Sequence, residues 1–244
     1  MNPVRYSRNL LHPVTNRHLD TESSSDNNFK LPNGVKKIIP VILTNDLKDL
    51  KNKLRRVRGL TDWVQIDIAD GKFVNNVSVG LKDLLKVKTK FNFEAHLMVL
   101  DPEKYLADCR RVGIKRVLFH FEATNQPLTV LDKIKKFGFE AGIALNPETP
   151  IYKIKPYLNK IGVILILGVH PGFSGQTFIP STLDKIRQLK KLSRQVKIEV
   201  DGGINLNNAQ KIVRAGADYL VVSSALFKSE NIKQTFKQLQ AEIR

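Results

Sequence analysis

Cysteine is almost absent from this 244-residue chain, in which Cys109 is the single one. One cysteine excludes a disulfide framework within the chain and is typical of a reducing compartment. Long apolar runs are missing too: the longest covers 161–169, whereas a bilayer-spanning helix needs about 20 residues. No secretory signal pattern is visible either. We therefore expect a cytoplasmic protein without a membrane partner.

Acidic residues are few compared with basic ones, 23 against 40, which gives a net charge of +17. A compact basic run with interleaved aromatic residues, which would indicate nucleic-acid binding, is nevertheless absent. The lysines are spread along predicted helices, for example Lys48, Lys51, Lys53, Lys82, Lys86, Lys88, Lys133, Lys135 and Lys136. This spacing favours solvated helix faces, and we expect no specific nucleic-acid partner.

The chain changes character near residue 35. Residues 1–34 hold few large apolar side chains and include a run of three serines at 23–25, so they predict a disordered extension. Residues 35–244 alternate regularly between apolar and amphipathic segments, which predicts one folded domain.

Eight strand-like segments of that domain are each followed by a helical pattern. The expected strands are Ile38–Leu43, Trp63–Ile68, Asn92–Met98, Arg116–His120, Ala141–Leu145, Val163–Val169, Lys197–Val200 and Tyr219–Val222. The expected helices are Leu47–Val57, Leu81–Lys88, Pro102–Arg111, Leu128–Phe137, Ile151–Leu158, Leu183–Lys191, Asn207–Ala215 and Ile232–Ile243. A doubly wound open sheet is the alternative, but eight even units favour a parallel (β/α)8 TIM barrel. In such barrels the chemistry lies at the carboxyl ends of the strands.

The second expected strand carries an unusual face. Side chains alternate along a strand, so Gln65, Asp67 and Ala69 share one side while Ile66 and Ile68 share the other. Polar groups on a buried strand are unfavourable unless they have partners. This broken pattern marks a candidate functional site.

Glycines and serines follow the last three strands and predict a phosphate site. They are Gly172, Phe173, Ser174 and Gly175, then Gly202 and Gly203, then Ser223 and Ser224. Glycine permits positive φ and close backbone approach, so successive amides can surround an anion. A small phosphorylated molecule is therefore the expected substrate.

Two carboxylates predict proton transfer. Asp67 and Asp201 end strands on opposite sides of the expected barrel mouth, where one can remove a proton and the other deliver one. His96 ends the third strand, and with both aspartates it could hold a divalent ion that stabilises an enediolate. Alternatively, Asp67 and Asp201 cap the following loops and His96 is a core histidine; that interpretation is preferred for His96 alone, but the three residues together favour the metal site.

Five ordered motifs resemble the ribulose-phosphate 3-epimerase family. They are Asp67-Ile-Ala-Asp-Gly-Lys-Phe-Val74, His96-Leu-Met-Val99 with Asp101-Pro-Glu-Lys-Tyr105, Phe119-His-Phe-Glu-Ala123, His170-Pro-Gly-Phe-Ser-Gly-Gln176 and Glu199-Val-Asp-Gly-Gly-Ile-Asn205. The resemblance runs from about residue 38 to the end of the chain. It implies a barrel isomerase of carbohydrate metabolism that interconverts D-ribulose 5-phosphate and D-xylulose 5-phosphate at C3, in the pentose phosphate pathway.

The resemblance also implies residue roles. Asp67 matches the proton acceptor and Asp201 the donor; both bind a divalent metal with His96 and a second histidine. His96 also belongs to the implied substrate site, and the glycine loop and serine pair bind phosphate. Family members are commonly oligomeric, so the resemblance implies a homo-oligomer.

Departures from the family pattern concern the metal and sugar sites. Gln65 stands where the second metal histidine falls, and Val41 where a substrate-binding serine falls. Ala69 and Leu167 replace methionines, and His170 replaces an asparagine. With Gln65 as an oxygen ligand, the set favours Mn²⁺, Fe²⁺ or Mg²⁺ over Zn²⁺. His170 could enter the site as a ligand or electrophile, or pack over its loop.

Three hypotheses follow. The first is an active pentulose-phosphate epimerase with an altered metal site. The second is an epimerase of another ketose phosphate, in which Val41, Ala69 and Leu167 reshape the sugar pocket. The third is a phosphosugar-binding barrel that turns over poorly. We prefer the first, because both aspartates, His96 and most of the phosphate loop are retained.

Overall fold

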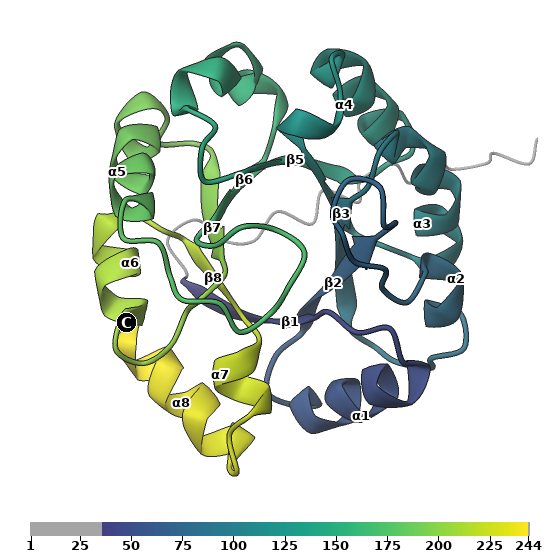
Figure 1. Ribbon diagram of the computed structural model, residues 1–244, viewed down its shortest axis with the longest axis vertical. Coiled ribbons are helices and arrows are strands. Elements are labelled where there is room, and N and C mark those ends of the chain that lie inside the picture. The colour runs from purple at the N-terminus through teal and green to yellow at the C-terminus, as the bar shows by residue number, and fades with distance from the viewer. Residues whose placement is uncertain (1–35, 244) are drawn as a thin grey trace, which may run out of the picture. The chain divides into compact units, whose positions relative to one another are not determined.

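Eight parallel strands close into a barrel in which each strand pairs with the next and β8 pairs with β1. The computed structural model describes residues 36–243. The strands are β1 (Lys37–Ile42), β2 (Trp63–Ala69), β3 (Asn92–Met98), β4 (Arg116–His120), β5 (Glu140–Leu145), β6 (Val163–Leu167), β7 (Lys197–Asp201) and β8 (Tyr219–Val222). Figure 1 looks along the barrel, with the helices as an outer ring. The predicted (β/α)8 barrel is confirmed, and the predicted disorder of residues 1–34 lies outside the described residues.

Helices follow the strands in the predicted order. They are α1 (Leu47–Val57), α2 (Leu81–Leu84), α3 (Leu106–Val112), α4 (Pro127–Lys136), α5 (Thr182–Leu192), α6 (Ala209–Ala215), α7 (Ser224–Phe227) and α8 (Ile232–Glu242). Three 3₁₀ helices join them: η1 (Pro102–Tyr105), η2 (Phe121–Ala123) and η3 (Ile151–Lys160). Among the described residues, no helix is long and apolar enough to cross a membrane.

Strand alternation divides most apolar side chains of the described residues between two clusters. Outward-facing residues such as Ile66 and Ile68 of β2 join the large core between strands and helices. Inward-facing residues such as Val41 and Leu165 fill the barrel itself. The inward positions of β2 are also the polar ones, which is why the sequence pattern was broken there.

A charged layer fills the amino-terminal end of the barrel. The Arg116 guanidinium donates to Glu94 at 2.5 Å, to Glu140 at 3.0 Å and to Glu199 at 3.3 Å. It also lies 4.7 Å from the ring centroid of Trp63. Burial raises the pKa of Glu199 well above its usual range, and neighbouring Glu94 raises it further. The guanidinium therefore compensates buried acidic groups directly beneath the polar face of β2.

Candidate active site

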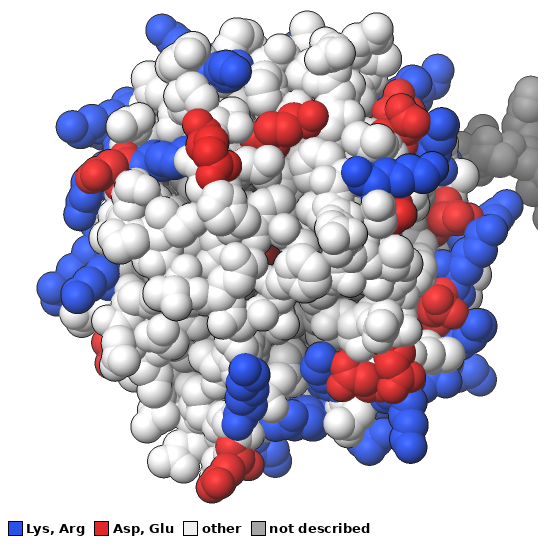
Figure 2. Space-filling model, viewed as in Figure 1, with Lys and Arg blue, Asp and Glu red and all other residues white. Residues whose placement is uncertain are grey.

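The carboxyl ends of the strands surround one pocket. It is lined by Asp67, His96, Gly172, Phe173, Ser174, Gly175, Asp201, Gly202, Gly203, Ser223 and Ser224, among others. The structure therefore brings together every predicted site residue except Gln65, which is fully buried beneath the pocket. Figure 2 shows acidic atoms at the bottom of a hollow near the centre of this face, with most Lys and Arg side chains towards its edge.

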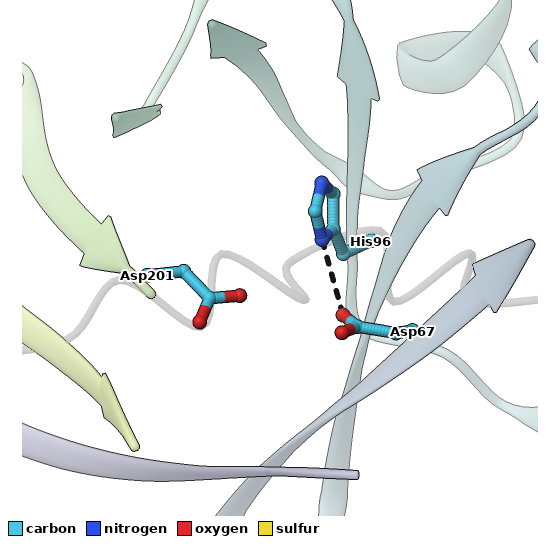
Figure 3. Close-up of side chains that lie close together, drawn as sticks. All are labelled: Asp67, His96 and Asp201. Carbon is cyan, nitrogen blue, oxygen red and sulfur yellow. Dashed lines mark hydrogen bonds and ion pairs between the residues drawn. The ribbon is translucent and has the colours of Figure 1, made fainter. Parts of the chain in front are cut away.

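Three side chains converge at the floor of the pocket. Asp67 comes from β2, His96 from β3 and Asp201 from β7, and their candidate ligand atoms all lie within 4.8 Å of one another. His96 Nδ1 lies 3.0 Å from Asp67 Oδ1, as the dashed line in Figure 3 marks. The two carboxylates approach from opposite sides of the barrel, as the sequence predicts.

Gln65 joins the two carboxylates from below. Its Nε2 donates to Asp67 Oδ1 and to Asp201 Oδ2, at 2.8 Å in both cases. Its Oε1 is buried and has no hydrogen-bond partner. An unpaired buried carbonyl oxygen is unfavourable by about 1–3 kcal/mol. This amide orientation therefore gives both carboxylates a donor but leaves the amide oxygen without one.

A second histidine, His120, contacts His96 on the side away from Asp67. His96 Nε2 lies 2.9 Å from His120 Nε2, and His120 Nδ1 lies 3.4 Å from Glu122 Oε2. Burial lowers the pKa of His120 to about 4, so this ring is neutral at physiological pH. With Nδ1–H of His120 donated to Glu122, its Nε2 accepts from Nε2–H of His96. His120 was not predicted as a site residue, because its contact with His96 depends on barrel closure, of which the local sequence gives no signal.

This chain of contacts prepares His96 Nδ1 for a cation. Burial opposes a charged ring, but the hydrogen bond to Asp67 and the charges of Asp67, Asp201 and Glu94 together outweigh it and raise the pKa of His96. A cation could take the place of that Nδ1 proton, because Nε2 is already engaged with His120.

The distances also fit a divalent ion. Neighbouring ligands about 2.1 Å from an octahedral ion lie roughly 3 Å apart. The tip of Gln65 is 2.8 Å from an oxygen of each aspartate, and His96 Nδ1 is 3.0 Å from Asp67. The amide must present Oε1 rather than Nε2 to act as a ligand. The residues present therefore fit a divalent cation bound by two carboxylates and an imidazole, with an amide oxygen available as a fourth ligand.

Asp201 has a raised pKa. Burial, together with the nearby charge of Asp67, raises the pKa of Asp201 to about 7. A carboxyl group with that pKa is protonated in a substantial fraction of molecules near neutral pH. Such a group can donate a proton, as a general acid must.

The glycine loops contain the positive φ angles that the sequence predicts. Positive φ values occur at four loop glycines: Gly172 (114°), Gly175 (86°), Gly202 (106°) and Gly203 (68°). A Cβ on Gly203 would lie 2.4 Å from the backbone nitrogen of Phe178, so this loop packs tightly as well as turning. Gln176 Nε2 closes the loop after β6 by donating to the carbonyls of His170 and Phe173, at 2.7 and 2.9 Å.

Lys228 adds a cation that the sequence analysis missed. No Lys or Arg belongs to the described residues that line the pocket. The Lys228 ammonium, just after α7, lies 3.7 Å from where a Cβ of Gly175 would stand. Only its position in the fold, and no motif, brings it to the glycine loop.

The substituted positions fall in different places. Val41 and Leu167 line the pocket with apolar side chains. Ala69 is buried in a small cluster with Val74 and Met98 and does not belong to the residues that line the pocket. His170 lies at the exposed rim, where its Nδ1 is 3.3 Å from Glu148.

The closed barrel, the two facing carboxyl groups at the carboxyl ends of its strands and the glycine loops define a (β/α)8-barrel protein with the layout of an acid–base enzyme. Residues 37–227 match the sequence profile described as the ribulose-phosphate 3 epimerase family. This chain therefore belongs to the ribulose-phosphate 3 epimerase family.

Curated relatives agree with this membership. The chain is 36% identical to ribulose-phosphate 3-epimerase of Synechocystis over 203 residues, covering 80% of this chain and 88% of the relative. It is 35% identical to the chloroplastic ribulose-5-phosphate-3-epimerase of Arabidopsis thaliana, covering 85% and 77%. It is 34% identical to ribulose-phosphate 3-epimerase of Escherichia coli K12, covering 84% and 95%.

Solved structures show the shared fold alone. The 3-hexulose-6-phosphate synthase of Salmonella typhimurium superimposes with a TM-score of 0.67 at 14% identity, covering 86% of this chain and 98% of the other. The orotidine 5'-phosphate decarboxylase of Pyrococcus horikoshii gives a TM-score of 0.61 at 16% identity, covering 85% and 99%.

Proposed function

We propose that this protein interconverts D-ribulose 5-phosphate and D-xylulose 5-phosphate by moving a proton at C3. The observation that carries the proposal is the convergence of Asp67 and Asp201 from opposite strands on one point of a pocket whose rim is a glycine loop. Membership of the epimerase family supports the substrate class and the reaction.

The two aspartates divide the proton transfer. Asp67 removes the C3 proton from one face of the bound sugar, and Asp201 delivers a proton to the other face. The raised pKa of Asp201 favours its role as donor. In the reverse reaction the roles exchange, because each carboxyl group has been left in the state that the other began in.

The remaining residues position the substrate. The glycine loop at Gly172–Gly175, the pair Gly202 and Gly203 and the serines Ser223 and Ser224 bind the phosphate through backbone amides and hydroxyls. Phe173 and Ser174 belong to that loop, and His96 lies beside the sugar carbon that reacts. The loops restrict water at the floor of the pocket, where Asp67 is only 7% exposed.

Asp67, His96, Asp201 and Gln65 would hold a divalent cation. When bound, it supplies polarisation of the sugar carbonyl and so stabilises negative charge on the enediolate. Three oxygen ligands and one nitrogen favour Mn²⁺, Fe²⁺ or Mg²⁺ over Zn²⁺.

The test measures conversion of ribulose 5-phosphate to xylulose 5-phosphate by the full chain supplied with Mn²⁺. Asp67→Asn and Asp201→Asn should each lower kcat by about 10²–10⁴-fold, because each removes an acid or base. A wild-type rate no higher than that of both variants would overturn the proposal.

The apolar side chains of Val41 and Leu167 in the pocket support an alternative candidate substrate. These positions offer no hydrogen bond to a sugar hydroxyl, so another ketose phosphate is the alternative. A kcat/KM at least tenfold higher for a hexulose phosphate than for ribulose 5-phosphate would select it.

We further infer that residues 35–244 form the catalytic domain and that the protein works as a homo-oligomer in the cytoplasm. Oligomerisation is inferred from the family resemblance, and the single cysteine supports a reducing compartment. Light scattering on the purified chain measures the oligomeric state, and a monomeric mass would contradict it.

A further inference from the structure

Three unpaired oxygens lie in the barrel beneath the pocket. The side-chain atoms Gln65 Oε1, Glu94 Oε1 and Glu199 Oε1 are buried without hydrogen-bond partners, and all three residues are fully buried. Gln65 and Glu94 are register partners on β2 and β3, so both point into the barrel side by side. Glu94 and Glu199 are joined through Nη1 of Arg116.

We propose that Glu94 positions Gln65 as an oxygen ligand of the divalent cation, by accepting a hydrogen bond from the Gln65 amide nitrogen when Oε1 turns towards the ion. Glu94 is a positioning residue in this arrangement, since it acts through Gln65 and touches no reacting atom. The proposal rests on the metal site of the proposed function and adds the group that sets its fourth ligand.

The amide of Gln65 can take two orientations. In the structure, Nε2 faces the two aspartates and Oε1 has no hydrogen-bond partner. With a cation, an N–H group beside it would be repelled, whereas the oxygen would be attracted. Turning the amide exchanges two atoms of nearly equal size and requires no other change of shape.

Turning the amide also gives a donor to an unpaired carboxylate oxygen on the amino-terminal side of Gln65. Its nitrogen then faces the layer that holds Glu94 Oε1, an acceptor that has no donor. Arg116 fixes Glu94 through the other carboxylate oxygen, so Oε1 remains available. Gln65 and Glu94 are register partners on adjacent strands, and Glu94 lies closer to the guanidinium than Glu199 does, at 2.5 Å against 3.3 Å. The acceptor beside Gln65 is therefore Glu94.

Glu94→Gln is the informative variant. Arg116 requires an oxygen, so the new amide presents its nitrogen towards Gln65 and favours the orientation with Oε1 facing down. We expect Mn²⁺ binding to weaken by about tenfold, the lower end of the range for partners of metal ligands. The measurement titrates metal-free full-length protein with Mn²⁺ and follows free Mn²⁺ by electron paramagnetic resonance, without substrate.

Glu140→Gln is the matched control. Glu140 pairs with the same guanidinium, but it begins β5, away from Gln65, and its side chain is 27% exposed. It should leave Mn²⁺ affinity within about twofold of the wild type. Thermal unfolding checks that both variants fold. Equal weakening by the two variants would assign the effect to charge around Arg116 and overturn the proposal.

A crystal structure with Mn²⁺ provides a second readout. We expect one amide atom of Gln65 at bonding distance from the ion and the other within hydrogen-bond distance of Glu94. An ion bound by Asp67, His96 and Asp201, with Gln65 still hydrogen-bonded to both aspartates, would contradict the proposal.

The outcome is separable from that of the proposed function. If Mn²⁺ binds as expected but ribulose 5-phosphate is not converted, the epimerase proposal fails and the role of Glu94 stands. If conversion persists in a chelator and Mn²⁺ does not bind, the role of Glu94 fails and the epimerase proposal stands.

Discussion

Lys228 lies beside the glycine loop that is expected to hold the substrate phosphate. Because it is exposed, its contribution is reduced to about 1 kcal/mol, which corresponds to roughly a fivefold change in affinity. We predict that Lys228→Met raises KM for ribulose 5-phosphate about fivefold with little change in kcat, as measured by steady-state kinetics. The increase should shrink at high salt.

Lys233→Met, on the outer helix α8, is the control and should leave KM unchanged. Equal KM values for both variants would show that Lys228 does not reach the phosphate.

At the residue scale, the predictability of the site depended on whether a residue lies within a recognisable motif at a strand end. The positions of Asp67, His96 and Asp201 followed from alternation and strand order, and the structure places them as expected. Glu94 and His120 were missed as partners, because a buried acid or histidine inside a strand gives no local signal of which strand faces it. Their contacts depend on barrel closure, which is set by all eight strands together.

Helix α1 gives a prediction at the scale of one element. Asp46 lies at its amino-terminal cap, and its side chain accepts a hydrogen bond from the backbone nitrogen of Lys48 at 2.8 Å. We predict that Asp46→Ala lowers the free energy of unfolding by about 1 kcal/mol, measured by urea denaturation, because a helix donor loses its partner.

Asp49→Ala in the same helix serves as the comparison. It removes a surface pair with Lys53, at 2.7 Å, which contributes about 0.3–0.5 kcal/mol. A larger loss for Asp49→Ala than for Asp46→Ala would contradict the assignment of the cap.

At the element scale, the eight strands were predicted within two residues at each end, because buried parallel strands form continuous apolar runs. Helices were predicted less well. The expected helix after β5 is a 3₁₀ helix with Pro156 inside it, and α2 ends at Leu84 rather than Lys88. The four-residue α7 was missed, since so short a helix has no periodicity to detect.

The buried charge layer gives a prediction for the whole barrel. Arg116→Met would leave Glu94 and Glu199 buried without their cation, a change that destabilises a protein by about 3–5 kcal/mol. We predict that urea denaturation will show a decrease of that size in the free energy of unfolding. Glu140→Gln, which affects a partly exposed carboxylate, should lower the free energy of unfolding by less than half as much. Equal stability of Arg116→Met and the wild type would show that the layer does not contribute.

The rate at which the Cys109 thiol is labelled measures how readily the structure around α3 opens. Burial raises the pKa of this thiol to about 12, and its side chain is fully buried in α3. We predict negligible labelling by a disulfide reagent at pH 8 in native buffer, with one thiol reacting per chain in denaturant. Rapid labelling in native buffer would show that α3 opens without global unfolding.

The single tryptophan gives the barrel a built-in optical probe. Trp63 is 2% exposed, begins the strand that carries Gln65 and Asp67, and lies against the Arg116 guanidinium. Tryptophan emission from this protein therefore comes from one ring in the charged layer. A shift of that emission on adding Mn²⁺ would show, in solution and without a label, that events at the pocket floor reach the amino-terminal end of the barrel.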